Sequence, residues 1–286
     1  MKLRVKLPLI FLPLVAIPLL IVGMVAYVQL RDSAEKSSVT QVVTLLEQID
    51  IQVDNLVDNT SSNLDLFSEY PLIKQYFLAE SEEERYTVLF RPIQRQFLNI
   101  QKAYPEYSEL RVILPDGFED VRLVNRDIPN LTEEEHNSPF FVELKNSSSE
   151  FVVRFDRNPD NNELVCYVSK RINLINEALD DPAAEPRLRG YLSATLDVTH
   201  LLSQLENNPL GEQSGIFLTD DKGQMMYLPE HIKWLSSENL PLGGLQSKYH
   251  ETIEQQVPLA GDDFKLSSHK LQNNLCLLYT SPSPRD

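Results

Sequence analysis

The fold is decided by Tyr107-Ser-Glu-Leu-Arg-Val-Ile-Leu-Pro-Asp-Gly-Phe-Glu-Asp-Val-Arg122. Leu110, Val112 and Leu114 recur at every second position, which is the period of a β-strand. Asp116-Gly117 then favours a tight hairpin turn, and a second strand is expected over Glu119–Val124. The segment therefore predicts the first antiparallel pair of a sheet.

More strands and helices surround this hairpin. Strands are predicted over Phe151–Phe155 and Leu164–Ile172, on either side of the turn Arg157–Asn162, and over Leu188–Leu196. Helices are predicted over Leu72–Leu78, Glu82–Ala103, Phe140–Lys145 and Val198–Glu206. This mixture predicts an α+β sheet domain.

A second unit is expected after Asn207–Gly211. Gly215–Pro229 predicts another hairpin, with Asp, Lys and Gly at its tip, and it parallels the first one. A helix near Glu230–Leu235 and strands near Tyr249–Val257 and Asp263–His269 follow. This internal repeat predicts two antiparallel sheet modules in tandem.

The N-terminus has the pattern of a membrane anchor. Leu7–Val28 is uncharged and apolar, and as a helix it reaches about 33 Å, enough to cross a hydrocarbon core of about 30 Å. The residues before it are basic and not acidic, which places them in the cytoplasm and everything after Leu30 outside it. A cleaved signal peptide is the alternative, but its apolar region is shorter and ends in a small-x-small site that Met24–Gln29 does not offer.

The next segment is predicted to be a long helix, because no Gly or Pro interrupts residues 31–70. One of its stripes advances in steps of three and four through Val39, Val42, Leu46, Ile49, Val53, Leu56, Thr60, Asn63 and Phe67. Such a heptad seam predicts a homodimer of parallel stalk helices. A single helix that packs one stripe onto its own domain has the same pattern, and that alternative stays open.

The last eleven residues, Cys276-Leu-Leu-Tyr-Thr-Ser-Pro-Ser-Pro-Arg-Asp286, resemble the translation of a transposase adapter used in DNA sequencing libraries. We therefore expect the natural sequence to stop being represented near Leu275 and the native chain to continue. A natural Ser/Pro-rich tail is the alternative. If the tail is an adapter, Cys166 is the only native cysteine, which excludes an intramolecular disulfide.

The composition excludes one class of partner. The chain has a formal net charge of −16, and a nucleic-acid binder needs a basic surface to neutralise phosphates. We expect no nucleic-acid partner. The acidic surface is interpreted as a solubilising one.

The anchor, the long helix, the segment 107–122 and Gly190-Tyr-Leu-Ser-Ala-Thr-Leu-Asp-Val198 together resemble the double-Cache sensor domains of bacterial membrane receptors. The resemblance implies a PAS-like membrane-distal ligand module, a membrane-proximal relay module, and a second membrane helix before a cytoplasmic output domain. It also implies that residues 31–275 lie in the periplasm, outside the inner membrane. The expected parts are a cytoplasmic N-terminus (1–6), a transmembrane helix (7–30), a stalk and helical region (31–104), a distal Cache module (105–206), an incomplete proximal Cache module (207–275) and the adapter (276–286).

Alternate positions on three predicted strands carry the side chains expected to contact a ligand: Arg154, Tyr167, Ser169, Arg171, Tyr191, Ser193, Thr195 and Asp197. The positions between them are apolar and suited to packing on the stalk helix. We hypothesise that the polar face forms the distal pocket, and that Arg154 or Arg171 clamps a carboxylate or phosphate bidentately. The alternative is a solvated face of an antiparallel sheet.

Amino-acid-sensing members of the family carry Arg-x-Trp-Tyr near the short helix, where this chain has Ser138-Pro-Phe-Phe141. Asp197 does match the acidic position that holds an amino group in those relatives. Because most of the motif is missing, an organic acid is preferred over an α-amino acid, and a module without a ligand stays open.

No catalytic site, metal site or cofactor is expected in this chain. Its five histidines are scattered without an HExxH pattern or Cys/His metal spacing, and it has no Gly-rich phosphate loop or Gly-x-Ser-x-Gly elbow. The expected function is the ligand-sensing input region of a transmembrane receptor, with a diguanylate cyclase (GGDEF) as the leading output. A sensor histidine kinase, a methyl-accepting chemotaxis receptor and a singly anchored binding protein without output are the alternatives.

Overall fold

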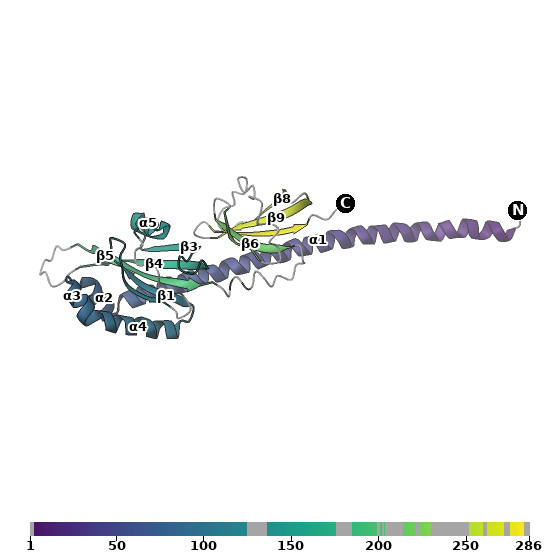
Figure 1. Cartoon of the computed structure of the whole chain (residues 1–286). Coiled ribbons are helices and arrows are strands. Elements are labelled where there is room, and N and C mark those ends of the chain that lie inside the picture. Colours follow the sequence, from purple (N-terminus) through teal and green to yellow (C-terminus); the bar gives the residue numbers. More distant parts are fainter. Residues whose placement is uncertain are drawn as a thin grey trace. The chain divides into compact units, whose positions relative to one another are not determined.

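The computed structural model describes residues 3–124, 136–175, 185–198, 201, 203, 214–220, 224–229, 252–259, 262–271 and 275–282. The chain divides into two compact units, Met1–Gln48 and Ile49–Asp286. Helix α1 (Leu3–Ser68) continues from the first unit into the second (Figure 1). The helix predicted over 230–235 and most of the one predicted over 198–206 lie outside the described residues.

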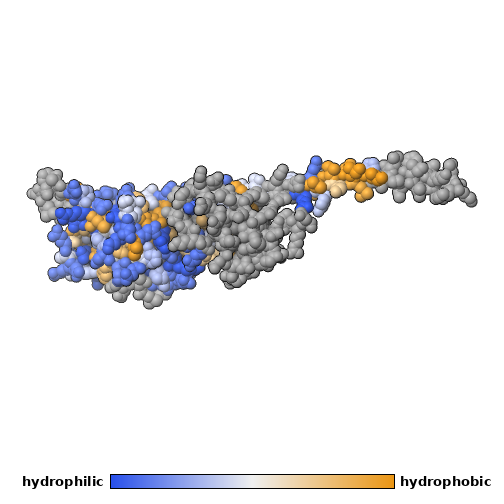
Figure 2. All heavy atoms as spheres, turned by 90° about the horizontal axis from the view of Figure 1, so that it is seen from above, coloured by the Kyte–Doolittle hydropathy of each residue, from blue (hydrophilic) through white to orange (hydrophobic). Residues whose placement is uncertain are grey.

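The first unit consists of the N-terminal part of α1. From Ile17 to Leu30 its large apolar side chains are exposed, for example Met24 at 73% and Leu30 at 72%, and they form an orange stretch in Figure 2. The side chains of 7–16, the first part of the predicted membrane span, lie outside the described ones. Within the described residues no helix is long and apolar enough to cross a membrane.

The stripe predicted as a dimer seam packs inside its own protomer from Ile49 onward. Four of its members are buried: Ile49, Val53, Thr60 and Phe67. Asn63 Nδ2 donates a hydrogen bond to Tyr107 Oη over 2.8 Å, and the ring centroids of Phe67 and Tyr104 lie 6.0 Å apart. This part of the stripe therefore follows the alternative, in which α1 packs on its own domain.

Four helical segments follow α1, namely α2 (Pro71–Leu78), α3 (Glu82–Glu84), the π-helical turn η1 (Arg85–Leu89) and α4 (Phe90–Ala103). The single helix predicted over 82–103 is thus divided. Pro92 lacks an N–H donor and its ring clashes with the carbonyl four residues earlier, so a regular helix cannot pass through this region unchanged. Beyond it, Ile93, Phe97 and Ile100 form the buried side of α4.

The first sheet has five antiparallel strands in the order β2-β1-β5-β4-β3. They are β1 (Tyr107–Ile113), β2 (Glu119–Val124), β3 (Phe151–Arg157), β4 (Leu164–Leu174) and β5 (Arg187–Asp197). The predicted hairpin is present as β1 and β2. Helices α2 and α4 lie along one face of this sheet and α5 (Pro139–Asn146) along the other (Figure 1).

The second sheet repeats this topology. Its strands run antiparallel in the order β7-β6-β10-β9-β8, so that in both sheets the last strand lies between the first and the fourth. They are β6 (Gly215–Asp220), β7 (Met225–Tyr227), β8 (Thr252–Leu259), β9 (Asp262–Lys270) and β10 (Leu275–Pro282). The chain is therefore an α+β protein with two antiparallel sheets, as the internal repeat predicted.

Strand β10 differs from the expectation for the C-terminal residues. The segment from Cys276 onward was expected to lie outside the fold, but Leu275–Pro282 pairs with β6 on one side and β9 on the other. Leu277 and Leu278, which point to opposite faces, are both buried, as in any central strand covered on two sides. An apolar alternation is sufficient for such pairing, so the adapter origin of these residues stays a prediction.

Candidate functional site

The candidate site is the side of the first sheet that α5 covers, here called the α5 face. Ser138 caps α5, because its Oγ accepts a hydrogen bond from the Phe141 backbone N–H over 3.0 Å, and Pro139 stands in the first turn. The helix contributes Phe140, Phe141 and Leu144 to a buried cluster with Ile113, Val152, Val165, Tyr167 and Tyr191. The short helix is therefore positioned by its cap and held by its aromatic side chains.

Five of the eight predicted site residues are buried in this sheet: Tyr167, Ser169, Tyr191, Ser193 and Thr195. They come from the neighbouring strands β4 and β5, and their registers bring them into pairs. Ser169 Oγ donates a hydrogen bond to Ser193 Oγ over 2.7 Å, and the Tyr167 ring stacks on Phe140 with centroids 4.7 Å apart. Asp197 is exposed at the end of β5. Burial of most of this row differs from the solvated sheet face that was the alternative.

Arg154 lies on the edge strand β3 and is partly exposed. Its Nη1 donates to Glu143 Oε2 of α5 over 2.7 Å and its Nε donates to Asp156 Oδ2 over 2.8 Å. Burial acts to lower the pKa of Arg154, but the hydrogen bonds to Asp156 and Glu143 outweigh it and raise the pKa above its usual value. The guanidinium is therefore a permanent cation that ties α5 to β3.

Arg171 holds the other end of α5. Its Nη1 donates to the carbonyl oxygens of Leu144, over 3.3 Å, and Ser147, over 2.5 Å, where the helix ends. A cation is favourable at this position because the C-terminal carbonyls of a helix carry partial negative charge. The guanidinium also lies 5.7 Å from the centroid of the Tyr191 ring. Burial raises the pKa of Tyr191, whose hydroxyl has no hydrogen-bond partner within the described part of the chain.

The sequence did not predict the charged network next to this row. Arg111 on β1 is 1% exposed; its Nη1 donates to Glu119 Oε1 over 2.7 Å, and its Nε lies 3.7 Å from Glu109 Oε2. Its guanidinium lies 5.2 Å from the Phe140 ring centroid and 5.0 Å from that of Tyr167. A buried cation between two carboxylates and two aromatic faces is a strong cross-link of the α5 face.

A second arginine extends the network to the turn after β3. Arg122 Nη2 donates to Glu109 Oε1 over 3.1 Å and to Asp160 Oδ2 over 2.5 Å. Asn158 Nδ2 donates to the same Glu109 oxygen over 2.7 Å. The one available signal was the alternation of acids and arginines on 109–122, where the register places Arg111 opposite Arg122. Such like charges need carboxylates between them.

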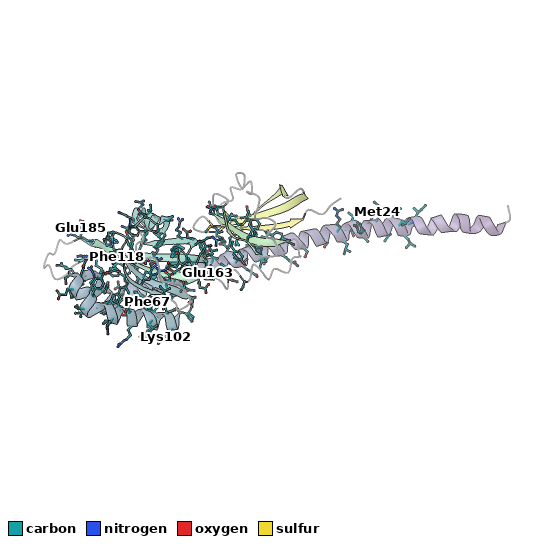
Figure 3. All side chains as sticks on the ribbon, viewed as in Figure 1. Met24, Phe67, Lys102, Phe118, Glu163 and Glu185 are labelled. Carbon is teal, nitrogen blue, oxygen red and sulfur yellow. The ribbon has the colours of Figure 1, made fainter. Side chains whose placement is uncertain are left out.

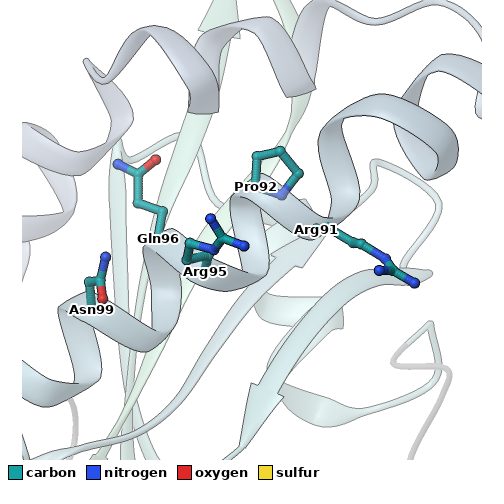
Figure 4. A pocket seen from close by; sticks show the side chains of 5 residues that line it. All are labelled: Arg91, Pro92, Arg95, Gln96 and Asn99. Atoms are coloured by element: carbon teal, nitrogen blue, oxygen red, sulfur yellow. The ribbon is translucent and has the colours of Figure 1, made fainter.

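A hollow of about 630 Å³ lies on the outer side of the helical layer. Its lining residues Arg91, Pro92, Arg95, Gln96 and Asn99 all belong to α4 (Figure 4). Arg91 and Arg95 are exposed and one helical turn apart. Since one exposed helix face supplies this lining, the hollow gives a cationic surface without the converging groups of a binding site.

No family model and no curated protein matches this chain. Solved structures do. The ligand-binding domain of the Campylobacter jejuni chemoreceptor Tlp3 in complex with L-valine is similar over 88% of this chain and 95% of its own, with a TM-score of 0.57 and 13% identity. A domain assigned to the sensory box/GGDEF family from Vibrio parahaemolyticus gives 87%, 97%, 0.56 and 13% for the same quantities. The sensor domain of the V. cholerae histidine kinase DctB gives 84%, 95%, 0.52 and 13%.

The chain has the fold of these sensor domains. The likeness confirms the architecture that the double-Cache resemblance implied. At this level of identity it concerns the fold, and the three neighbours belong to three different output classes.

The buried network yields a stability prediction. Arg111→Met leaves the carboxylates of Glu119 and Glu109 buried without their cation, and we expect a loss of about 3–5 kcal/mol in the free energy of unfolding, measured in urea. Arg154→Met makes the same replacement in a partly exposed ion pair and should cost about 1 kcal/mol or less. Equal losses in the two variants would contradict the role assigned to Arg111.

Proposed function

We propose that this chain is the ligand-sensing input region of a transmembrane signalling receptor. The observation that carries the proposal is the pair of sheets with the same strand order after one long N-terminal helix. This is the architecture of the chemoreceptor, GGDEF-family and histidine-kinase sensor domains to which the chain is similar. The distal module would bind the ligand, and the proximal module would relay the change.

The N-terminal part of α1 is proposed to anchor the chain in the inner membrane, with residues 1–6 in the cytoplasm. The uncharged run Leu7–Val28 and the basic residues before it support this. So do the exposed apolar side chains from Ile17 to Leu30, which would otherwise contact water.

Pairing of two copies is proposed to use the outward side of α1. The inward stripe from Ile49 onward is already buried, whereas Ile51 is 61% and Leu66 is 54% exposed on the same helix. Parallel anchoring in one membrane would hold two such helices at high effective concentration.

Anchor and pairing can be measured together. We expect the whole chain to stay in the membrane pellet after alkaline carbonate extraction, and to have the mass of two copies in detergent by light scattering. Deletion of residues 1–30 should release the protein into the soluble fraction. A whole chain that is extracted by carbonate contradicts the anchor, and a monomeric mass in detergent contradicts the pairing.

The ligand is proposed to be a small organic acid that binds at the α5 face. Arg171 supports this choice, because its guanidinium is held only by carbonyl oxygens of α5 in the contacts described above, and a ligand carboxylate is a stronger acceptor than a carbonyl. Transfer of Arg171 from Ser147 to the ligand would loosen the end of α5. Ligand binding would then favour one of two positions of the helix, as a receptor requires.

Titration calorimetry with succinate tests the anion clamp. We expect Arg171→Ala and Arg154→Ala each to weaken binding about tenfold or more, since each removes a charge-assisted hydrogen bond. Arg157→Ala is the control: it removes an exposed arginine from the end of the same strand as Arg154. Succinate affinity that is unchanged in both Arg171→Ala and Arg154→Ala excludes the clamp.

The output is proposed to be a diguanylate cyclase, a choice supported by the double-Cache resemblance and by one of the structural neighbours. Sequencing the genomic locus beyond codon 275 tests it. We expect an apolar run of about 20 residues and then a GGDEF domain. A phosphoacceptor-histidine helix there would make the parent a kinase, and a methyl-accepting signalling helix would make it a chemoreceptor. A frame that ends in Ser-Pro-Ser-Pro-Arg-Asp would contradict both the adapter and the signalling output.

A further inference from the structure

A second cavity lies away from the α5 face contacts described above. It has a volume of about 410 Å³ and is bounded by η1 and the residue before it, by the β1–β2 turn with the start of β2, and by His136. The residues that matter for its chemistry are Glu82, Arg85, Tyr86, Asp116, Phe118 and Asp120. Figure 3 labels Phe118, which is 41% exposed, on the β1–β2 turn.

A buried carboxylate in the wall of this cavity fixes its shape. The Asp120 side chain has 0% exposure; its Oδ2 accepts a hydrogen bond from Tyr76 Oη over 3.0 Å and lies 3.1 Å from Arg85 Nε. Its Oδ1 accepts a hydrogen bond from Tyr86 Oη over 2.5 Å. The carboxylate therefore joins β2 to α2 and η1, and the cavity is part of the built structure.

These contacts also determine the state of Tyr86. Burial and the hydrogen bond to Asp120 raise the pKa of Tyr86 to about 12, so the phenol is neutral and donates to Asp120 at physiological pH. Because the hydroxyl is engaged, Tyr86 offers the cavity its ring, which is 43% exposed. Phe118 offers a second aromatic surface from the opposite element.

The charges of the lining indicate the class of ligand. Arg85 is engaged by Asp120 and by the Ala79 carbonyl oxygen, at 3.4 Å from its Nη1. Glu82 and Asp116, both exposed, add two more carboxylates to the same cavity. An anionic ligand would meet an excess of negative charge, whereas a cation would meet carboxylates and aromatic faces together.

A bare metal ion fits this lining less well than an organic cation. Within the described ranges no three His, Cys, Asp or Glu side chains are grouped as metal ligands would be. A cavity of this volume is also far larger than an ion, and lies in the range that holds small molecules. Aromatic rings beside carboxylates are the surroundings that ammonium groups on organic molecules prefer.

We propose that this cavity binds a small organic cation, an amine or quaternary ammonium compound, between the Glu82 and Asp116 carboxylates and the rings of Tyr86 and Phe118. The site is distinct from the anion clamp at Arg154 and Arg171 and does not rest on the proposed function. A protein that fails to bind succinate can still bind a cation here.

Titration calorimetry on the whole chain in a non-ionic detergent tests the site with choline and putrescine as probes. The neutral control is 3,3-dimethyl-1-butanol, which has the shape of choline without its charge. We expect saturable binding of at least one cation at concentrations up to about 10 mM, and binding of the neutral compound about tenfold weaker or more.

Variants distinguish the cavity from the overall acidity of the protein. Glu82→Gln and Asp116→Asn together should weaken cation binding about tenfold or more, while Glu83→Gln, the same change on the neighbouring residue outside the lining, should leave it unaltered. Phe118→Leu retains apolar bulk but removes the ring, and should weaken binding about threefold. All of these side chains are exposed, so folding is preserved and is verified by the thermal midpoint.

Three outcomes would overturn the proposal. The first is absence of saturable binding by either cation. The second is equal affinity for choline and its neutral analogue. The third is an equal effect of the Glu82→Gln and Glu83→Gln single variants, which would assign the binding to the general surface charge.

Discussion

Burial of the Arg111 guanidinium inside the first sheet is the constraint on which the rest of this module depends. A cation with almost no exposed surface is stable only where carboxylates and aromatic faces replace its water. Glu119 supplies a carboxylate from β2, Phe140 a ring from α5, and Tyr167 a ring from β4. One side chain therefore fixes the hairpin register and the seat of α5 at the same time.

The position of α5 depends on a small number of polar contacts at its ends. Phe140 near its N-terminus rests on Arg111, and its last carbonyls accept hydrogen bonds from Arg171. On the strand that carries Arg171, the neighbouring Lys170 pairs with Asp65 of α1 and donates to Ser68 Oγ over 3.1 Å. The α5 face and α1 are thus attached to adjacent residues of β4. A shift of this strand would be felt on both sides of the sheet.

Local patterns in the sequence were sufficient for the elements of the fold. The alternation around Leu110 and Val112 predicted β1, and the turn at Asp116-Gly117 predicted the hairpin, where Gly117 has a φ of +98°. The repeat of that hairpin in the second half predicted a second sheet. The division of the helix before Pro92 was missed, because periodicity is the same on both sides of a π-helical turn.

By itself, the sequence determined which segments are strands and helices, that two similar modules follow one long helix, and which side chains alternate on each strand. Only the tertiary structure decided that the face with Tyr167 and Tyr191 is buried under α5, and that β5 lies between β1 and β4. It also decided that Asp120 joins Tyr76, Tyr86 and Arg85 across a cavity. The physical reason is that alternation and turn chemistry act over a few residues. Burial and charge pairing depend on neighbours that are distant in the chain, and spacing along the sequence does not specify those neighbours.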